Sequence, residues 1–435
     1  MFNSAQLAIL LTVTSICRFT QDNERNTEEL IRKLGDPSAE VRDIAERQLA
    51  ELGEGVEVRL QLTLERTDDV EVRLRGQRIL RSVRFGRAFG ASLGRRFAYS
   101  DPEVKCDLLR RVNPDTFGDL SSKQICDMIA ADLLQSPPPS RALVSLLDWV
   151  VSSDARWLAP LATSLLRTTS LPPSVRAKSA WTIAETREAP AVLLEYISDQ
   201  DSTVRAAVVL CACRSDLVTD PGVIIRLLDD ASSEVRLSAI RGLQFIQASN
   251  SVEAIARKVD DPDCTVQIAA LGALRSFRAT QFASAAEKQL GNPDSQVRSQ
   301  AVLSFAVLRG KESLDRVLAY TKDEAGIVRA RAVEAVRLLG VGDRLDQLSA
   351  LLRDPDAGVR AETIAAFTEV RALQYKSDIA NLLRDSEASV RFSAAGFFLT
   401  NPAAADPAVI KRAIEYETNA VTKRVLQLVL ERLEQ

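Results

Sequence analysis

Residues 36–49 read Asp-Pro-Ser-Ala-Glu-Val-Arg-Asp-Ile-Ala-Glu-Arg-Gln-Leu, and variants of this stretch recur along much of the chain. Its Val-Arg pair, or a close relative, returns every 31 residues without insertion, at Val204-Arg205, Val235-Arg236, Val266-Gln267, Val297-Arg298, Val328-Arg329, Val359-Arg360 and Val390-Arg391. One further step reaches Val421-Thr422, and near the start the pair stands at Val41-Arg42 and Val72-Arg73. A fixed period of this length is typical of a solenoid, in which stacked units share one core.

Polar residues stand at fixed distances before each pair. Six residues before the Arg stands an acid or its amide, at Asp36, Asp199, Asp230, Asp261, Asn292, Asp323, Asp354 and Asp385. Four residues before it stands a helix-capping residue in most units, at Ser38, Asp201, Ser232, Asp263, Asp294 and Asp356. Such side chains accept hydrogen bonds from the free N–H groups of a helix start, which is worth ~1 kcal/mol. The pattern therefore predicts a helix start in every unit.

Apolar residues follow each pair at helical spacing. Three residues after the Arg stand small residues such as Ala239, Ala270, Ala301, Ala332 and Ala394, and seven after it stand Leu243, Leu274, Phe305, Val336, Phe367 and Phe398. This spacing places them on one stripe of a helix. A shorter apolar helix is predicted after it, for example over residues 252–259 and 345–352. Since neither helix can bury its stripe alone, we expect an all-α chain, an α-α superhelix of about thirteen two-helix repeats.

The string Asp-Pro-x-x-x-Val-Arg-x-x-Ala-x-x-x-Leu resembles a HEAT repeat, and the short period resembles the subgroup of that family named after the phycobilisome lyases. The resemblance covers residues 28–112 and 171–435. It implies a scaffold or adaptor that binds another protein or, as an alternative, a bilin lyase-like subunit that handles a chromophore. A metal-dependent hydroxylase with similar repeats uses His-Glu pairs, but this chain has no His, so that activity is not carried over.

Composition narrows the chemistry further. The absence of His removes the commonest general base and most zinc sites, and the six Cys form no paired zinc spacing. We therefore expect no catalytic residue, no metal and no cofactor, and we interpret the Cys as buried apolar residues. A net charge of −3 argues against nucleic acid as a partner.

The repeat pattern divides the chain into four segments. Residues 1–25 contain an apolar run that is either an export signal or a capping helix, and we favour export, hence an exported or periplasmic location over a cytoplasmic one. The run is too short for a permanent membrane span. Residues 26–112 are predicted N-terminal repeats, residues 113–170 degenerate repeats, and residues 171–435 regular repeats. Three Trp, at positions 149, 157 and 181, lie in or near the degenerate part, where an exposed Trp would indicate an interface.

Residues 71–112 hold eleven Lys and Arg against four Asp and Glu. One hypothesis is a binding patch for an anionic partner, an acidic protein or, as a less favoured alternative, nucleic acid, built from Arg84, Arg87, Arg95 and Arg96 with interleaved Phe and Gly. The alternative is a solvated basic helix, which we favour because Arg at every third position spirals around a helix instead of forming one stripe.

The partner surface is predicted on the second helix of each unit, which we expect to line a concave face. Its outward residues are Glu253, Arg257, Glu287, Lys288, Asp315, Arg316, Arg344, Gln347, Asp378, Asn381, Arg412 and Glu415. Their mixed charges indicate a protein partner, and we expect the solenoid itself to be a monomer.

The repeated Asp and Arg positions are interpreted as a ladder of ion pairs that joins neighbouring units, and not as a row of catalytic carboxylates. A pair that recurs in every unit is explained by the stacking of the units. Exposed ion pairs are worth only ~0–1 kcal/mol, whereas removing a core Phe costs ~3–5 kcal/mol. We therefore expect Phe305→Ala to lower the free energy of unfolding in urea by ~3–5 kcal/mol and Arg298→Ala to lower it far less. A larger loss for Arg298→Ala would contradict this ranking.

Overall fold

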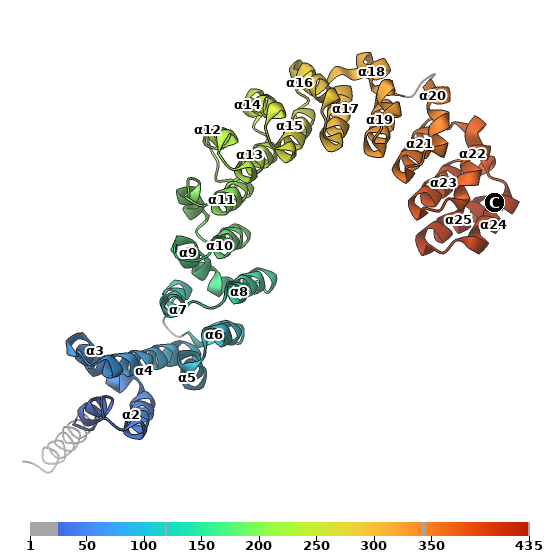
Figure 1. Cartoon of the computed structure of the whole chain (residues 1–435). Helices are drawn as coiled ribbons and strands as arrows, with labels where there is room; N and C mark the ends of the chain where they lie inside the picture. Colours follow the sequence, from blue (N-terminus) through green and yellow to red (C-terminus); the bar gives the residue numbers. More distant parts are fainter. Residues whose placement is uncertain (1–24, 118–119, 341–343, 434–435) are drawn as a thin grey trace, which may run out of the picture. The chain divides into compact units, whose positions relative to one another are not determined.

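The computed structural model describes residues 25–117, 120–340 and 344–433. All regular elements in these ranges are helices, packed in chain order as pairs, so the predicted all-α superhelix is confirmed (Figure 1). Packing divides the chain into two units, residues 1–215 and residues 216–435. The predicted export signal lies outside the described residues, and no described helix has the length and apolarity needed to cross a membrane.

The first unit begins with a helical stretch at residues 25–33. It continues through α2 (Ala39–Glu51), α3 (Glu57–Arg66), α4 (Val70–Phe89), α5 (Ala91–Tyr99), α6 (Pro102–Leu109), α7 (Ser122–Gln135), α8 (Ser140–Ser152), α9 (Ala159–Arg167), α10 (Pro173–Thr186) and α11 (Ser202–Arg214).

The second unit alternates short helices with long helices that carry the repeated pair. The short helices are α12 (Gly222–Arg226), α14 (Val252–Arg257), α16 (Ala283–Lys288), α18 (Leu314–Ala319), α20 (Leu345–Ser349), α22 (Lys376–Asn381) and α24 (Pro407–Tyr416). The long helices are α13 (Ser233–Phe245), α15 (Cys264–Ser276), α17 (Ser295–Arg309), α19 (Gly326–Leu339), α21 (Ala357–Glu369), α23 (Ala388–Thr400) and α25 (Ala420–Leu433). From α12 to α22, a 3-10 turn directly follows each short helix, for example Leu382–Arg384 after α22.

The Asp residues of the capping column cap the long helices as predicted. Asp294 accepts hydrogen bonds from the backbone N–H groups of Gln296 (2.8 Å) and Val297 (3.1 Å). Ser38 and Ser232 also occupy the residue before a helix, but neither side chain makes a capping hydrogen bond. The cap prediction therefore holds for the Asp residues and is wrong for these two Ser residues.

The core of the second unit is the layer between long and short helices. The Val of the repeated pair is fully buried from Val235 to Val390, and Phe305, Phe367 and Phe398 are buried as predicted. Consecutive long helices pack closely against one another, whereas consecutive short helices make at most slight contact. Small residues at the long-helix contacts, such as Ala301, permit this close approach.

This unequal packing decides which helices lie on the inner side. Within the second unit the long helices lie on the inner side of the curve and the short helices on its outer side (Figure 1). The prediction that the second, short helices line a concave face is therefore wrong for this unit. The physical reason is that the more closely packed layer spans the shorter arc.

The ladder between units is present. In the rung of Arg329, one guanidinium nitrogen donates to the backbone carbonyls of Asp323 (2.9 Å) and Glu324 (3.0 Å) in its own unit. The two remaining nitrogens donate to the carboxylate of Asp354 in the next unit, at 2.8 and 2.7 Å. That carboxylate also accepts the backbone N–H of Asp356 at 2.8 Å. Equivalent side-chain pairs are Arg176–Asp199, Arg236–Asp261, Arg298–Asp323, Arg360–Asp385 and Arg391–Glu417.

The rungs are buried, which corrects the expectation of exposed pairs. The side chains of Arg298 and Asp323 are only 10% and 11% exposed, and those of Arg236 and Asp261 only 10% and 3%. Removing one partner of a buried pair leaves an uncompensated charge and costs roughly 3–5 kcal/mol. Arg298→Ala is therefore expected to lower the free energy of unfolding by as much as Phe305→Ala does. This replaces the far smaller loss expected from the sequence.

One rung replaces both charges with amides. At the position of the Arg, Gln267 donates to the backbone carbonyl of Asp261 (2.7 Å), and its side-chain oxygen accepts from the Asn292 amide (3.2 Å). The Arg and the Asp are both replaced by amides in this rung, so the two side chains still form a hydrogen bond but carry no charge.

The last unit departs from the 31-residue period by one residue. Val421 is 63% exposed, whereas Thr422 is 1% exposed and takes the place of the buried Val. The final rung also joins residues 26 apart, Arg391 and Glu417, where the other Arg-Asp rungs of this unit join residues 25 apart. The predicted final pair at Val421-Thr422 is therefore wrong by one position, because α24 carries an extra residue.

The amide rung suggests a double-mutant test of the ladder. Arg329→Gln and Asp354→Asn are each expected to lower the free energy of unfolding by roughly 3 kcal/mol, because each leaves a buried charge alone. The double variant recreates the neutral amide rung, so it should cost at least about 2 kcal/mol less than the sum of the singles. Urea unfolding measures all three. The exposed pair Arg353 and Asp378 is the control: the losses of its two single variants should add up to the loss of the double variant within about 0.5 kcal/mol. Additive losses at the buried rung would refute a coupled ladder.

The ladder also predicts acid sensitivity. Burial works to raise the pKa of Asp323, Asp354 and Asp385, but hydrogen bonds and charges from the paired Arg hold each pKa below its ordinary value. A lowered pKa in the folded state contributes stability above the unfolded value of ~3.9, and this stability is lost as pH falls through the lower, folded value. The urea midpoint should therefore decrease from pH 5 toward roughly pH 3. The Arg329→Gln, Asp354→Asn variant should lose less over this range, and an equal loss would count against the rungs as its source.

Candidate partner-binding surfaces

The described residues include no cluster arranged as a metal site. No group of three or more His, Cys, Asp or Glu side chains in these ranges is arranged to hold a metal ion. Burial raises the pKa of Cys106, Cys126 and Cys211 to about 12 and that of Cys213 to about 11, so these thiols stay protonated near neutral pH. Cys264 is exposed at the start of α15, which corrects the interpretation that all Cys are buried.

The positive charge of residues 71–112 is largely compensated by neighbouring acids. Arg84 pairs with Glu57 (3.0 Å), and Arg87 pairs with Glu54 (2.8 Å) and Glu57 (3.0 Å). Arg75, Arg81 and Lys105 likewise pair with acids of α2 or α7. Of the four predicted anion-binding residues, Arg95 and Arg96 lie exposed on α5 without a carboxylate partner in the described part of the chain.

The Phe and Gly residues of this stretch are structural. Phe85, Phe89 and Phe97 are buried and contact one another, with ring centres 4.4–5.8 Å apart. A Cβ on Gly94 would lie 2.2 Å from the backbone nitrogen of Gly86, so these glycines permit α4 and α5 to pack closely. The hypothesis that they expose aromatic rings and backbone to an anionic partner is therefore wrong. Glycine spacing alone does not distinguish the two roles.

The residues predicted to meet a partner lie on or beside the short helices, on the outer side of the second unit. Most form ion pairs: Glu253–Arg257, Glu287–Arg316, Lys288–Asp260, Asp315–Arg344 and Asp378–Arg353. Gln347, Asn381, Arg412 and Glu415 are exposed. The structure thus spreads these twelve residues over several layers and does not gather them at one place.

The long helices of the second unit carry exposed apolar side chains. Phe245, Val307 and Leu338 are 56%, 37% and 54% exposed, and they stand at the same position near the ends of three long helices. On α21, burial and the Glu334 carboxylate raise the pKa of Glu362. Apolar residues mixed with partly buried charges are typical of a protein-binding surface.

In the first unit, the long helices α8 and α10 form a groove around two tryptophans. Trp149 and Trp181 are half-buried and line a cavity of about 650 Å³. Lys178 forms an ion pair with Asp148 at its edge, and the guanidinium carbon of Arg214 lies 5.8 Å from the ring centre of Trp181. The third Trp, Trp157, is also half-buried, but its ring packs against Phe117, with ring centres 5.1 Å apart. Sequence reasoning noted the three Trp but could not tell which two share a groove.

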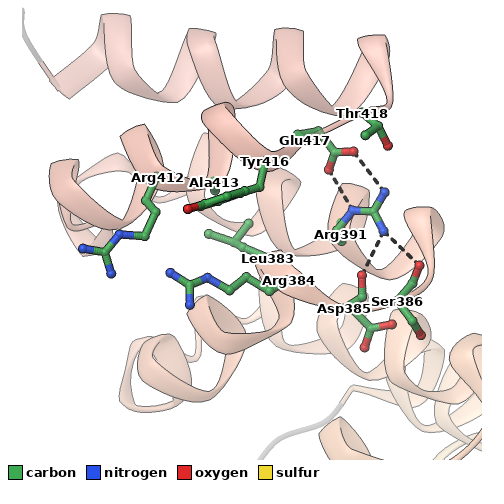
Figure 2. Close-up of a pocket in the computed structure, with 10 residues that line it drawn as sticks. All are labelled: Leu383, Arg384, Asp385, Ser386, Arg391, Arg412, Ala413, Tyr416, Glu417 and Thr418. Carbon is green, nitrogen blue, oxygen red and sulfur yellow. Dashed lines mark hydrogen bonds and ion pairs between the residues drawn. The ribbon is translucent and has the colours of Figure 1, made fainter.

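A second pocket, of about 810 Å³, lies between the 3-10 turn Leu382–Arg384 and α24. Figure 2 shows the side chains of Arg384, Arg412 and Tyr416 extending toward the same side of the pocket. Arg412 was predicted from the sequence as a partner-binding residue, whereas Arg384 and Tyr416 were missed. The signal that could have revealed them is the shift of the last acid to Glu417, one residue beyond its expected place.

With this geometry established, comparisons with known proteins agree with the repeat pattern. A family model described as HEAT repeats matches residues 220–306, 253–337 and 283–368. Together these matches span residues 220–368. No curated protein matches the chain.

Several solved structures are similar to the chain at low identity. YibA of Escherichia coli is 15% identical, with a TM-score of 0.42, covering 57% of this chain and 93% of that one. The complex of CpcE and CpcF of phycocyanin lyase from Nostoc sp. PCC7120 is 16% identical, with a TM-score of 0.36, covering 56% and 94%. Yeast importin-beta (Kap95p) is 13% identical, with a TM-score of 0.49, covering 94% and 67%. Similarities at this level carry no conclusion about function.

Proposed function

We propose that the chain is a non-enzymatic scaffold that binds another protein along the face formed by its long helices. The observation that carries the proposal is the groove of Trp149 and Trp181, because half-exposed Trp beside charged groups is typical of binding hot spots. In the second unit, Phe245, Val307 and Leu338 are likewise exposed apolar side chains on long helices. The HEAT-repeat matches over residues 220–368 agree with such a role.

The residues predicted on the short helices, such as Glu253 and Arg257, remain a second candidate surface for a protein partner. They are less favoured here because many of their charges are already paired within the chain. The alternative of a bilin lyase-like subunit rests on the family resemblance, and co-expression with a bilin followed by visible absorbance of the purified protein would test it.

Capture of partners from a lysate of the source organism tests the favoured face. Trp149→Ala with Trp181→Ala is expected to reduce the yield of specifically captured protein by about ten-fold or more, because each lost hot spot costs roughly 2 kcal/mol. A matched control, Glu253→Ala with Arg257→Ala on the short-helix side, should capture as much as the wild type. Circular dichroism melts verify that both variants fold. The reverse pattern, with loss in the control alone, would move the binding surface to the short helices.

A further inference from the structure

The pocket beside α24 lies where the repeat pattern of outer-side ion pairs ends. One unit earlier, the outer-side guanidinium of Arg353 pairs with Asp378 at 2.9 Å. Thirty-one residues further along, the Arg is kept as Arg384, but position 409 is Val. Among the described residues, neither Arg384 nor Arg412 has a carboxylate partner. Two positive charges therefore stand uncompensated on one pocket.

The acids that line the same pocket cannot neutralise these two charges, because they belong to the ladder. Asp385 accepts two hydrogen bonds from Arg360, at 2.8 and 2.7 Å. Glu417 accepts two from Arg391, at 2.8 and 3.0 Å, and its side chain is only 1% exposed. Both carboxylates are fully engaged in the wall of the pocket, as Figure 2 shows for the second of these pairs.

Helix α24 also contributes an aromatic ring to the pocket that the two cations line. Arg412 and Tyr416 are four residues apart on this helix, so they lie on the same side of it. Tyr416 is 73% exposed, and its ring extends toward the same side of the pocket as the two guanidinium groups (Figure 2). Leu383 and Ala413 supply an apolar floor. The pocket thus combines two planar, forked donors, a phenol O–H and an apolar surface.

We propose that Arg384, Arg412 and Tyr416 form a binding site for an acidic peptide segment of a partner protein. A guanidinium binds a carboxylate through two parallel hydrogen bonds, and two such groups on one pocket suit neighbouring acidic side chains. The ring and the apolar floor accommodate an apolar side chain between them. A nucleic acid would require a continuous row of cations along its backbone, whereas Glu415 on α24 and Glu387 at the start of α23 are exposed acids. The site lies apart from the long-helix face, so it goes beyond the proposed scaffold function and can fail independently of it.

Fluorescence anisotropy with the full chain and a labelled peptide of six Glu around two Leu tests the proposal. Arg384→Ser with Arg412→Ser is expected to weaken binding of this peptide by roughly ten-fold or more. The matched control, Arg316→Ser with Arg353→Ser, removes two exposed guanidinium groups from the same outer surface and should stay within about two-fold of the wild type. Tyr416→Ala should weaken binding, and Tyr416→Phe should retain most of it because the ring is kept.

Three results would overturn the proposal. Equal losses in both double variants would indicate non-specific attraction to the surface charge. Equal binding of a peptide with Gln in place of Glu would exclude carboxylate recognition. Tighter binding of a single-stranded RNA oligomer, lost in the Arg384→Ser, Arg412→Ser variant, would assign the pocket to nucleic acid instead. Melting curves of every variant separate lost binding from lost folding.

Discussion

The guanidinium that joins one unit to the next is the interaction on which the rest of this structure depends. Arg329 holds the turn carbonyls of its own unit and the Asp354 carboxylate of the following unit at once. The same carboxylate accepts the N–H of Asp356, at the entrance to α21. The start of each long helix is therefore positioned by the unit before it, and spacing between units is fixed by hydrogen bonds as well as by apolar packing.

Because every rung needs the same residue types, the side chains at the repeated polar positions bind one another and do not bind a partner. Their charges are buried and paired, and where one is replaced, as at Gln267, the partner Asn292 is replaced as well. Surfaces that differ from those of the regular units occur where the 31-residue repeat is interrupted. The Trp groove lies on α8 and α10 in the irregular first unit, and the pocket of Arg384 and Tyr416 follows an added residue in the last unit.

The unequal packing of the two helix layers has a second consequence. The long helices pack closely against one another, and Phe245 and Leu338 are exposed near the ends of two of them. The short helices are more widely separated, and their exposed charges pair across the gaps, as Asp315 does with Arg344. One layer thus offers apolar contact area, and the other offers a neutralised polar surface.

The sequence by itself determined the helical fold, the 31-residue unit, the Asp caps and the ladder, because each follows from spacing along the chain. It could not determine the burial of the rungs, because burial depends on how closely neighbouring layers approach. Nor could it assign the inner face to the long helices, or show that Glu54 and Glu57 compensate Arg87. It also misplaced the last pair, since a single added residue changes which side chain, Val421 or Thr422, points inward. These features were decided by the tertiary structure, because charge and exposure at one position depend on residues about 30 positions away that only packing brings into contact.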